Sequence, residues 1–104
     1  MTRPIALIVD DHPMNAKLFS FVLRARGLDV TTAASASEMW TVLSTLVPAV
    51  LLLDIQLPGT DGLTLARQLR ADRRFGSLPI LAVTAYAQAF GELVMRWVER
   101  GHAP

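Results

Sequence analysis

With 104 residues, the chain is long enough for one domain with one hydrophobic core. Its net charge of +1 gives no general attraction to nucleic acids or acidic membranes, and no apolar stretch approaches the ~20 residues of a membrane span. The sequence has no cysteine, which excludes disulfides and thiolate metal sites, and no signal-peptide pattern, so we expect a cytoplasmic protein.

The first predicted strand is the apolar run over residues 5–9, since runs of this length bounded by turn residues are typical of buried parallel strands. A helix is predicted to begin near Pro13, because proline suits the first helical turn, and Gly27 is its predicted stop. Four residues at helical spacing form the predicted apolar stripe of this helix: Leu18, Phe21, Val22 and Ala25.

A weaker strand is predicted over residues 28–33. Ser35 and Glu38 then make a capping-box pattern, which indicates the start of a second helix. Pro48 is predicted to end this helix. Its apolar residues also recur at helical spacing: Met39, Trp40, Leu43 and Val47.

The second half of the sequence continues this alternation. It predicts a strand over residues 49–53, a helix from about 61 to 71, a strand over residues 80–83 and a last helix over about 87–100. In the helix over residues 61–71, three residues are expected to point inward: Leu65, Ala66 and Leu69. Four strands alternating with four helices predict an α/β fold with a parallel sheet, right-handed crossovers and helices on both faces.

Acidic residues stand at the ends of two predicted strands. Asp10 and Asp11 follow the first strand, and Asp54 follows the apolar run of the third. Open parallel sheets place functional groups beyond the carboxyl ends of their strands, so these three carboxylates are expected to share one crevice. There they repel one another by roughly 4 kcal/mol per pair at about 4 Å and an effective dielectric near 20. A hard divalent cation with oxygen ligands is the natural partner for such a group.

Simpler interpretations exist for each of these residues. An aspartate at position 10 or 11 could cap the following helix, although a cap needs only one carboxylate. Asp54 could bond its own turn, and Thr84, at the end of the last strand, could be an ordinary β-branched strand residue. Acids at two strand ends and a hydroxyl at a third are harder to explain without a function.

Four segments resemble the receiver domain of bacterial two-component response regulators: Asp10-Asp11, Asp54 with Leu57-Pro58, Asp61-Gly62 and Thr84-Ala85-Tyr86-Ala87. The resemblance covers residues 5–87. It implies a flavodoxin-like, doubly wound parallel sheet. It also implies a regulatory phosphoacceptor that catalyses at most its own phosphorylation and dephosphorylation. The phosphoryl group would come, with Mg²⁺, from the phosphohistidine of a sensor histidine kinase or phosphotransfer protein.

The resemblance also assigns roles to particular residues. Asp54 would be the phosphoacceptor and a metal ligand, Asp11 a direct Mg²⁺ ligand, and Asp10 the residue that holds metal-bound water. The backbone carbonyl of Gln56 would supply a further oxygen. The resemblance further implies that Thr84 and Tyr86, which follow the last predicted strand, act as a switch that responds to the phosphoryl group.

The sequence departs from the family pattern after Ala87. The family continues with a fifth strand ending in Lys-Pro and a fifth helix, whereas the only lysine of this chain is Lys17, in the first predicted helix. We therefore expect one receiver domain over residues 1–104 that lacks the fifth strand, the fifth helix and the active-site lysine. Arg96 or Arg100 would replace that lysine only if the last helix bent toward the crevice.

The last predicted helix carries a broad apolar surface: Phe90, Leu93, Val94, Trp97 and Val98. Without a fifth strand and helix beside it, part of this surface needs another partner, so we expect a homodimer. Two groups of residues predict no function. His12 and His102 are too isolated to suggest a transition-metal site, and four arginines form a solvated face: Arg67, Arg70, Arg73 and Arg74.

Three functions remain open. The complete acidic group favours a phosphoacceptor signalling domain, whereas the missing lysine favours a degenerate, unphosphorylated receiver that serves for dimerisation or docking. A magnesium-dependent phosphatase of the haloacid-dehalogenase type would also use an aspartate at a strand end. It would need a second acid two residues later, where this sequence has Gln56.

Overall fold

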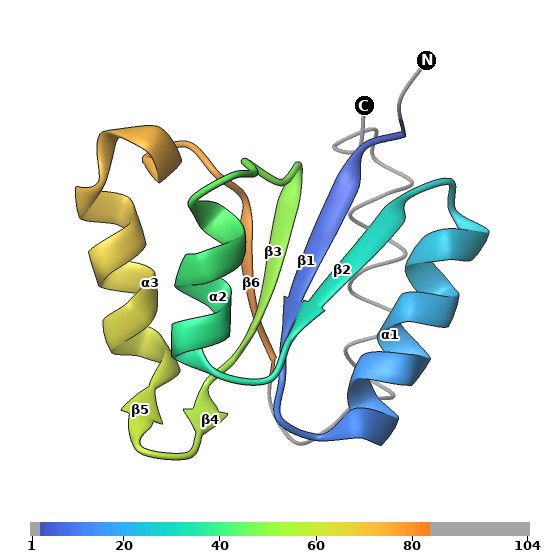
Figure 1. Ribbon diagram of the computed structural model, residues 1–104, viewed down its shortest axis with the longest axis horizontal. Helices are drawn as coiled ribbons and strands as arrows, with labels where there is room; N and C mark the ends of the chain where they lie inside the picture. The colour runs from blue at the N-terminus through green and yellow to red at the C-terminus, as the bar shows by residue number, and fades with distance from the viewer. Residues whose placement is uncertain (1–2, 84–104) are drawn as a thin grey trace.

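The computed structural model describes residues 3–83, and its main feature is a parallel sheet (Figure 1). Four strands form this sheet in the order β2-β1-β3-β6: β1 (Ile5–Val9), β2 (Asp29–Ala33), β3 (Val50–Asp54) and β6 (Ile80–Val83). Three helices connect the strands: α1 (Pro13–Ala25), α2 (Ala36–Leu43) and α3 (Gly62–Ala71). Short elements complete this part of the chain: β4 (Gln56–Leu57), β5 (Thr60–Asp61) and the 3₁₀ helix η1 (Arg73–Phe75).

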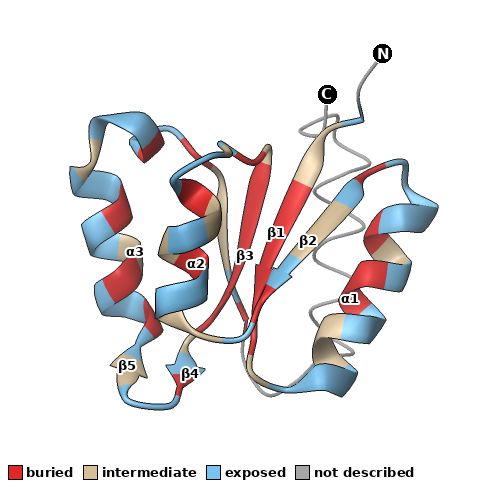
Figure 2. Ribbon diagram, viewed as in Figure 1, coloured by how far each residue is buried: buried red, intermediate tan, exposed pale blue. Residues whose placement is uncertain are grey.

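The predicted parallel sheet with helices on both faces is confirmed. Residues alternate along β1 and β3 between two buried clusters, and both strands are buried almost throughout (Figure 2). One cluster joins the sheet to α2 and α3 and includes Leu7, Val9, Leu51 and Leu53. The other joins the opposite face to α1 and includes Ala6, Ile8, Val50 and Leu52. Because β1 and β3 contact helices on both sides, they read in the sequence as continuous apolar runs.

The predicted apolar stripe of α1 was wrong for three of its four residues, since only Val22 packs against the core. The buried residues of this helix are Phe19, Ser20 and Leu23, while Leu18 is 45% exposed and Phe21 is 75% exposed. Both sets of residues fit a helical period, so periodicity alone does not decide which set meets the sheet. Ser20 tolerates the buried position because its hydroxyl donates a hydrogen bond to the Ala16 carbonyl, at 2.6 Å.

Helix α2 begins as expected and ends earlier than predicted. The Ser35 hydroxyl accepts a hydrogen bond from the Glu38 backbone N–H at 3.1 Å, which confirms the cap. The helix ends at Leu43, and Val47, which was predicted to belong to it, is 61% exposed. Ser44 and Thr45 explain the early end, because their hydroxyls donate to the helix carbonyls at positions 41 and 42, at 2.6 and 3.2 Å.

The hairpin of β4 and β5 and the 3₁₀ helix η1 were not predicted as elements. Pro58 and Gly59 occupy the turn between β4 and β5, and Gly59 has φ +69°, the sign that a type II turn requires there. In η1, Phe75 is fully buried against the α2 and α3 side of the sheet. Both elements are too short to produce a hydrophobic period in the sequence.

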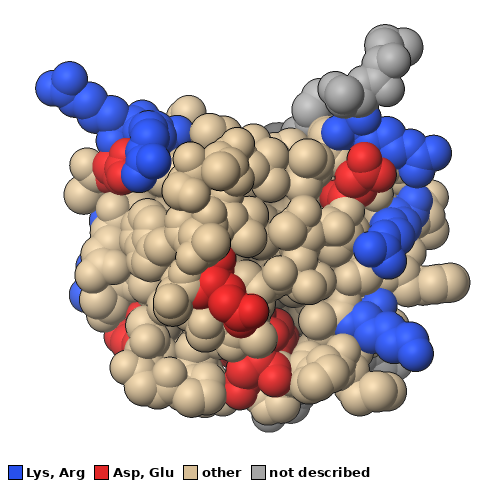
Figure 3. Space-filling view, viewed as in Figure 1, with Lys and Arg blue, Asp and Glu red and all other residues tan. Residues whose placement is uncertain are grey.

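Basic side chains gather in two places on one face of the molecule (Figure 3). On the face drawn in Figure 3 they line the α1 side and the corner beside η1, while several acidic side chains lie in the lower part, where the strands end.

The arginines near η1 are not only a solvated face. Arg74 pairs with Asp72 at 2.8 Å, and the Arg70 guanidinium donates to the Phe75 carbonyl at 3.1 Å. These contacts hold the turn that leads to β6.

Several predictions concern residues outside the described part of the chain. The switch residues Thr84 and Tyr86, the last helix, its apolar surface and the missing fifth strand all fall there, so the homodimer stays a prediction. Within residues 3–83, β6 pairs with β3 alone. No helix of the described part combines the length and the apolarity that a membrane crossing would need.

Candidate functional site

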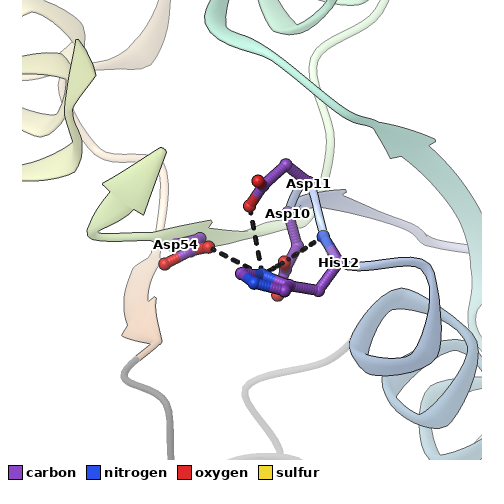
Figure 4. A group of neighbouring side chains, drawn as sticks. All are labelled: Asp10, Asp11, His12 and Asp54. Carbon is purple, nitrogen blue, oxygen red and sulfur yellow. Dashed lines mark hydrogen bonds and ion pairs between the residues drawn. The ribbon is translucent and has the colours of Figure 1, made fainter. Parts of the chain in front are cut away.

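The predicted acidic residues lie together at the carboxyl ends of β1 and β3. The two strands are parallel and in register, with Val9 opposite Leu53, so the next residue of each strand is an aspartate. One ligand atom from each of Asp10, Asp11, His12 and Asp54 falls within a group whose members all lie within 4.8 Å of one another. Figure 4 shows these side chains turned toward a common centre. The expected convergence of the three carboxylates is therefore present in the fold.

Asp10 does not cap helix α1, and neither does Asp11. The residue at the N-cap position is His12, and its side chain makes no capping hydrogen bond. Asp10 Oδ1 instead accepts a hydrogen bond from the His12 backbone N–H at 2.8 Å. The second carboxylate oxygen of Asp10, Oδ2, is buried and has no hydrogen-bond partner. A buried oxygen of this kind is costly unless a cation or a donor satisfies it, so the simple capping interpretation fails and a cation fits.

Asp54 is buried at the end of β3 and is 6% exposed. Its Oδ1 accepts a hydrogen bond from the Gln56 backbone N–H at 2.8 Å, so it does bond its own turn, as the simpler interpretation proposed. Burial raises the pKa of Asp54, and the charges of Asp10 and Asp11 raise it further, while the bond from Gln56 and the charge of His12 lower it in part. The site therefore disfavours an ionised Asp54 unless positive charge is brought in.

Gly62 sets the position of the Asp54 backbone, a role that the sequence analysis missed. A Cβ at position 62 would lie 2.5 Å from the Asp54 carbonyl oxygen and 2.5 Å from the Ile55 Cα. The first residue of α3 thus packs directly against the end of β3, and the Gly62 N–H donates to the Ile55 carbonyl at 3.3 Å. The Asp-Gly pair at positions 61 and 62 was the signal, since glycine at the start of a helix suggests close backbone approach.

His12 belongs to the site, so the prediction that it is isolated was wrong. Its ring Nδ1 lies 3.1 Å from Asp10 Oδ1, 3.1 Å from Asp11 Oδ1 and 3.8 Å from Asp54 Oδ2. The contact with Asp10 and the charge of Asp11 raise the pKa of His12. His12 follows two acids directly in the sequence, and this adjacency was the available signal.

The remaining predicted site residues have different outcomes. Gln56 lies in β4 beside Asp54, and its backbone N–H is engaged by the Asp54 carboxylate. The role of the Gln56 carbonyl as a metal ligand stays a prediction. Thr84 and Tyr86 follow β6 directly but lie outside the described residues, so their predicted switch role is untested.

Comparisons with known proteins agree with this geometry. The response regulator receiver domain family matches residues 6–101. The chain belongs to this family. It is therefore a receiver domain of two-component signalling, a regulatory class of protein domain.

Two relatives and one solved structure illustrate the similarity. The DNA-binding response regulator MtrA of Mycolicibacterium smegmatis is 39% identical over 80% of this chain and 35% of its own length. The polar-differentiation response regulator DivK of Brucella ovis is 34% identical over 84% of this chain and 70% of its own length. A CheY-like receiver domain from Methylobacillus flagellatus superposes with a TM-score of 0.73 at 30% identity, over 80% of this chain and 70% of the other. The flavodoxin-like receiver fold is confirmed, and the chain spans about a third of the length of MtrA.

Proposed function

We propose that this receiver domain accepts a phosphoryl group on Asp54 from the phosphohistidine of a sensor histidine kinase or phosphotransfer protein, in a Mg²⁺-dependent reaction. The observation that carries the proposal is the buried Asp54 carboxylate beside a second buried carboxylate, Asp10, one of whose oxygens lacks any partner. The family and the gathered acids support the proposal.

The residues present fit a hard divalent cation. Asp11 and Asp54 would offer carboxylate oxygens, Asp10 would hold a metal-bound water, and the Gln56 carbonyl would complete the protein ligands. Mg²⁺, when bound, offsets the charge of the carboxylates and of the incoming phosphoryl group. The partnerless Asp10 oxygen supports this assignment, because a metal-bound water would donate a hydrogen bond to it.

The protein residues mainly position the reactants. A carboxylate oxygen of Asp54 attacks the phosphorus atom, an aspartyl phosphate forms, and the bond from phosphorus to the histidine nitrogen breaks, with the electron pair leaving on the imidazole. The Gln56 N–H fixes the orientation of the Asp54 carboxylate before the attack. We propose that Thr84 then donates its hydroxyl hydrogen to the phosphoryl oxygens and that Tyr86 moves with it.

Intact mass spectrometry tests the proposal. Incubation of the protein with Mg²⁺ and acetyl phosphate should add the mass of one phosphoryl group, and both Asp54→Asn and omission of Mg²⁺ should abolish the gain. Asp61→Asn is the matched control, because Asp61 is an acid of the same region whose carboxylate caps α3 through the Leu63 N–H at 3.0 Å. This control should still be phosphorylated. A wild-type chain that gains no mass with Mg²⁺ would contradict the proposal.

An unphosphorylated docking module is the second candidate. It is favoured by one observation, the three large apolar side chains that α1 exposes: Met14 (76%), Leu18 (45%) and Phe21 (75%). A wild-type chain that is inert in the mass experiment and dimeric in size-exclusion chromatography with light scattering would favour this candidate. A monomer at micromolar concentration would contradict the predicted homodimer under either function.

A further inference from the structure

We propose that His12 makes this cation site selective for divalent transition-metal ions, by adding a nitrogen ligand to the carboxylates. The inference rests on the cation site of the proposed function and goes beyond it, because it assigns a metal preference and a ligand that the magnesium assignment does not use. The chemical class of the ion is a first-row divalent metal that binds imidazole well, with Zn²⁺ as the representative probe.

The distances around His12 match the spacing of ligands around one ion. Ligand atoms at about 2.0–2.2 Å from a shared ion lie roughly 3.0–3.6 Å from one another in octahedral or tetrahedral geometry. His12 Nδ1 lies 3.1 Å from Asp10 Oδ1 and 3.1 Å from Asp11 Oδ1, within this range, and 3.8 Å from Asp54 Oδ2, just above it. Small side-chain shifts would therefore let one ion contact the imidazole and the carboxylates together.

The Asp10 side chain supplies an independent observation. It is 1% exposed, and its Oδ2 has no hydrogen-bond partner although it belongs to the same group of side chains. Its Oδ1 already receives the His12 backbone N–H at 2.8 Å. Hydrogen bonds within the group therefore leave a buried carboxylate oxygen unsatisfied, and a metal ion, directly or through bound water, would satisfy it.

His12 combines a fixed backbone with an accessible ring. Its backbone N–H is held by Asp10, whereas its side chain is 62% exposed, so an ion can reach Nδ1 from solvent. Figure 4 shows the ring lying between the three carboxylates. Oxygen ligands alone suit Mg²⁺, which keeps several waters, whereas imidazole suits zinc, nickel and copper. An imidazole at this place therefore strengthens the binding of a transition metal more than the binding of Mg²⁺.

Calorimetric titration of Zn²⁺ and of Mg²⁺ into the full chain tests the inference, with His12→Gln as the variant. His102→Gln is the matched control, because it removes the only other histidine of the sequence. We expect the ratio of Zn²⁺ to Mg²⁺ affinity to fall about tenfold or more in His12→Gln, and to stay at the wild-type value in His102→Gln.

A spectroscopic measurement on the wild-type chain does not depend on how the variant folds. In ¹⁵N NMR of the histidine rings, Zn²⁺ should move the Nδ1 resonance of His12, assigned by its absence in His12→Gln. An unchanged affinity ratio in His12→Gln, or a His12 Nδ1 resonance that Zn²⁺ does not move, would overturn the inference. If Mg²⁺ still binds in that case, the proposed function survives, whereas a chain that binds neither ion contradicts both.

Discussion

The interiors of β1 and β3 differ from their carboxyl ends within a single residue. Val9 and Leu53 are 0% and 1% exposed and pack in the core, and the residues that follow them, Asp10 and Asp54, are almost as deeply buried at 5% and 6%. Burial therefore continues from the strand interior to its end. The buried polar groups at the end are not fully hydrogen-bonded or solvated, because one Asp10 oxygen has no hydrogen-bond partner and burial raises the pKa of Asp54. The strand interiors stabilise the fold, and part of that stability offsets the cost of burying two carboxylates at the strand ends.

The largest effect is expected in the strand interior. Leu52→Ala removes a side chain that is 1% exposed and packs on the α1 side of the sheet, so it should lower the free energy of unfolding by about 2–5 kcal/mol. Leu18→Ala is the matched control on α1, and because Leu18 is 45% exposed the change should stay within about 0.5 kcal/mol. Urea unfolding measures both. Similar losses in the two variants would contradict the burial described here.

The second largest effect is expected at the carboxyl end of β3, where Gly62 packs against the backbone. In Gly62→Ala the new Cβ would meet the Asp54 carbonyl oxygen at 2.5 Å, so the end of β3 must shift, and we expect a loss of about 1–3 kcal/mol. Phosphorylation of Asp54 should fall in the same variant, because the acceptor moves. Gly76→Ala is the control, since the nearest atom to its Cβ would be 3.8 Å away. A fully active, fully stable Gly62→Ala protein would show that the backbone contact has no positioning role.

At the strand end, removing a charge should stabilise the protein. Without divalent cations at neutral pH, Asp54→Asn should raise the free energy of unfolding by on the order of 1 kcal/mol, because it removes a buried charge and, to a smaller extent, its repulsion from Asp10 and Asp11. Chemical unfolding in the presence of a chelator measures this change. Asp61→Asn keeps an oxygen that can accept the Leu63 N–H at the N-cap of α3, so the free energy of unfolding should change little in this control.

The pH dependence of that gain follows from the sign of the pKa shift. Because the pKa of Asp54 is raised in the folded state, protonation favours folding, and this contribution is lost as the pH rises through the folded pKa. The advantage of Asp54→Asn over the wild type should therefore be present at neutral pH and shrink as the pH falls through the folded pKa of Asp54. An advantage that does not shrink as the pH is lowered would mean that Asp54 is not the titrating group.

The smallest effect is expected far from the boundary, at the start of α2. Ser35→Ala removes the hydroxyl that accepts the Glu38 N–H at 3.1 Å and should cost about 1 kcal/mol. Ser37 is the second residue of α2 and serves as the control. Ser37→Ala should leave the free energy of unfolding unchanged or slightly raised, because alanine favours the helix. Thermal unfolding of the two variants gives a local baseline against which the effects at β3 can be compared.

The sequence predicted correctly those strands and helices whose hydrophobic pattern depends only on their own residues. β1 and β3 were located because strands that are buried on both sides are continuous apolar runs, and α3 because its inward residues recur at helical spacing. The convergence of the acids followed from the parallel sheet, since the carboxyl ends of neighbouring strands meet at one edge.

The remaining features depend on contacts that the pattern does not contain. The inward face of α1 is chosen by packing against the sheet, which put Phe19 and Leu23 inside where Leu18 and Phe21 were expected. The place of His12 depends on the direction of one exposed ring, and the place of Gly62 depends on a backbone approach from another segment. The Asp-Gly pair and the two acids before His12 point to these places in the sequence, but neither signal fixes the distance between the atoms.

The parallel register of β1 and β3 limits the changes in strand length that the acidic group can tolerate. Side chains along a strand alternate between faces, so one inserted or deleted residue in β3 would exchange the leucines of the two helix-covered sides and carry Asp54 away from Asp10 in the same event. Because β3 is apolar toward both helix layers, the exchanged residues would remain buried, and the damage would fall mainly on the acidic group.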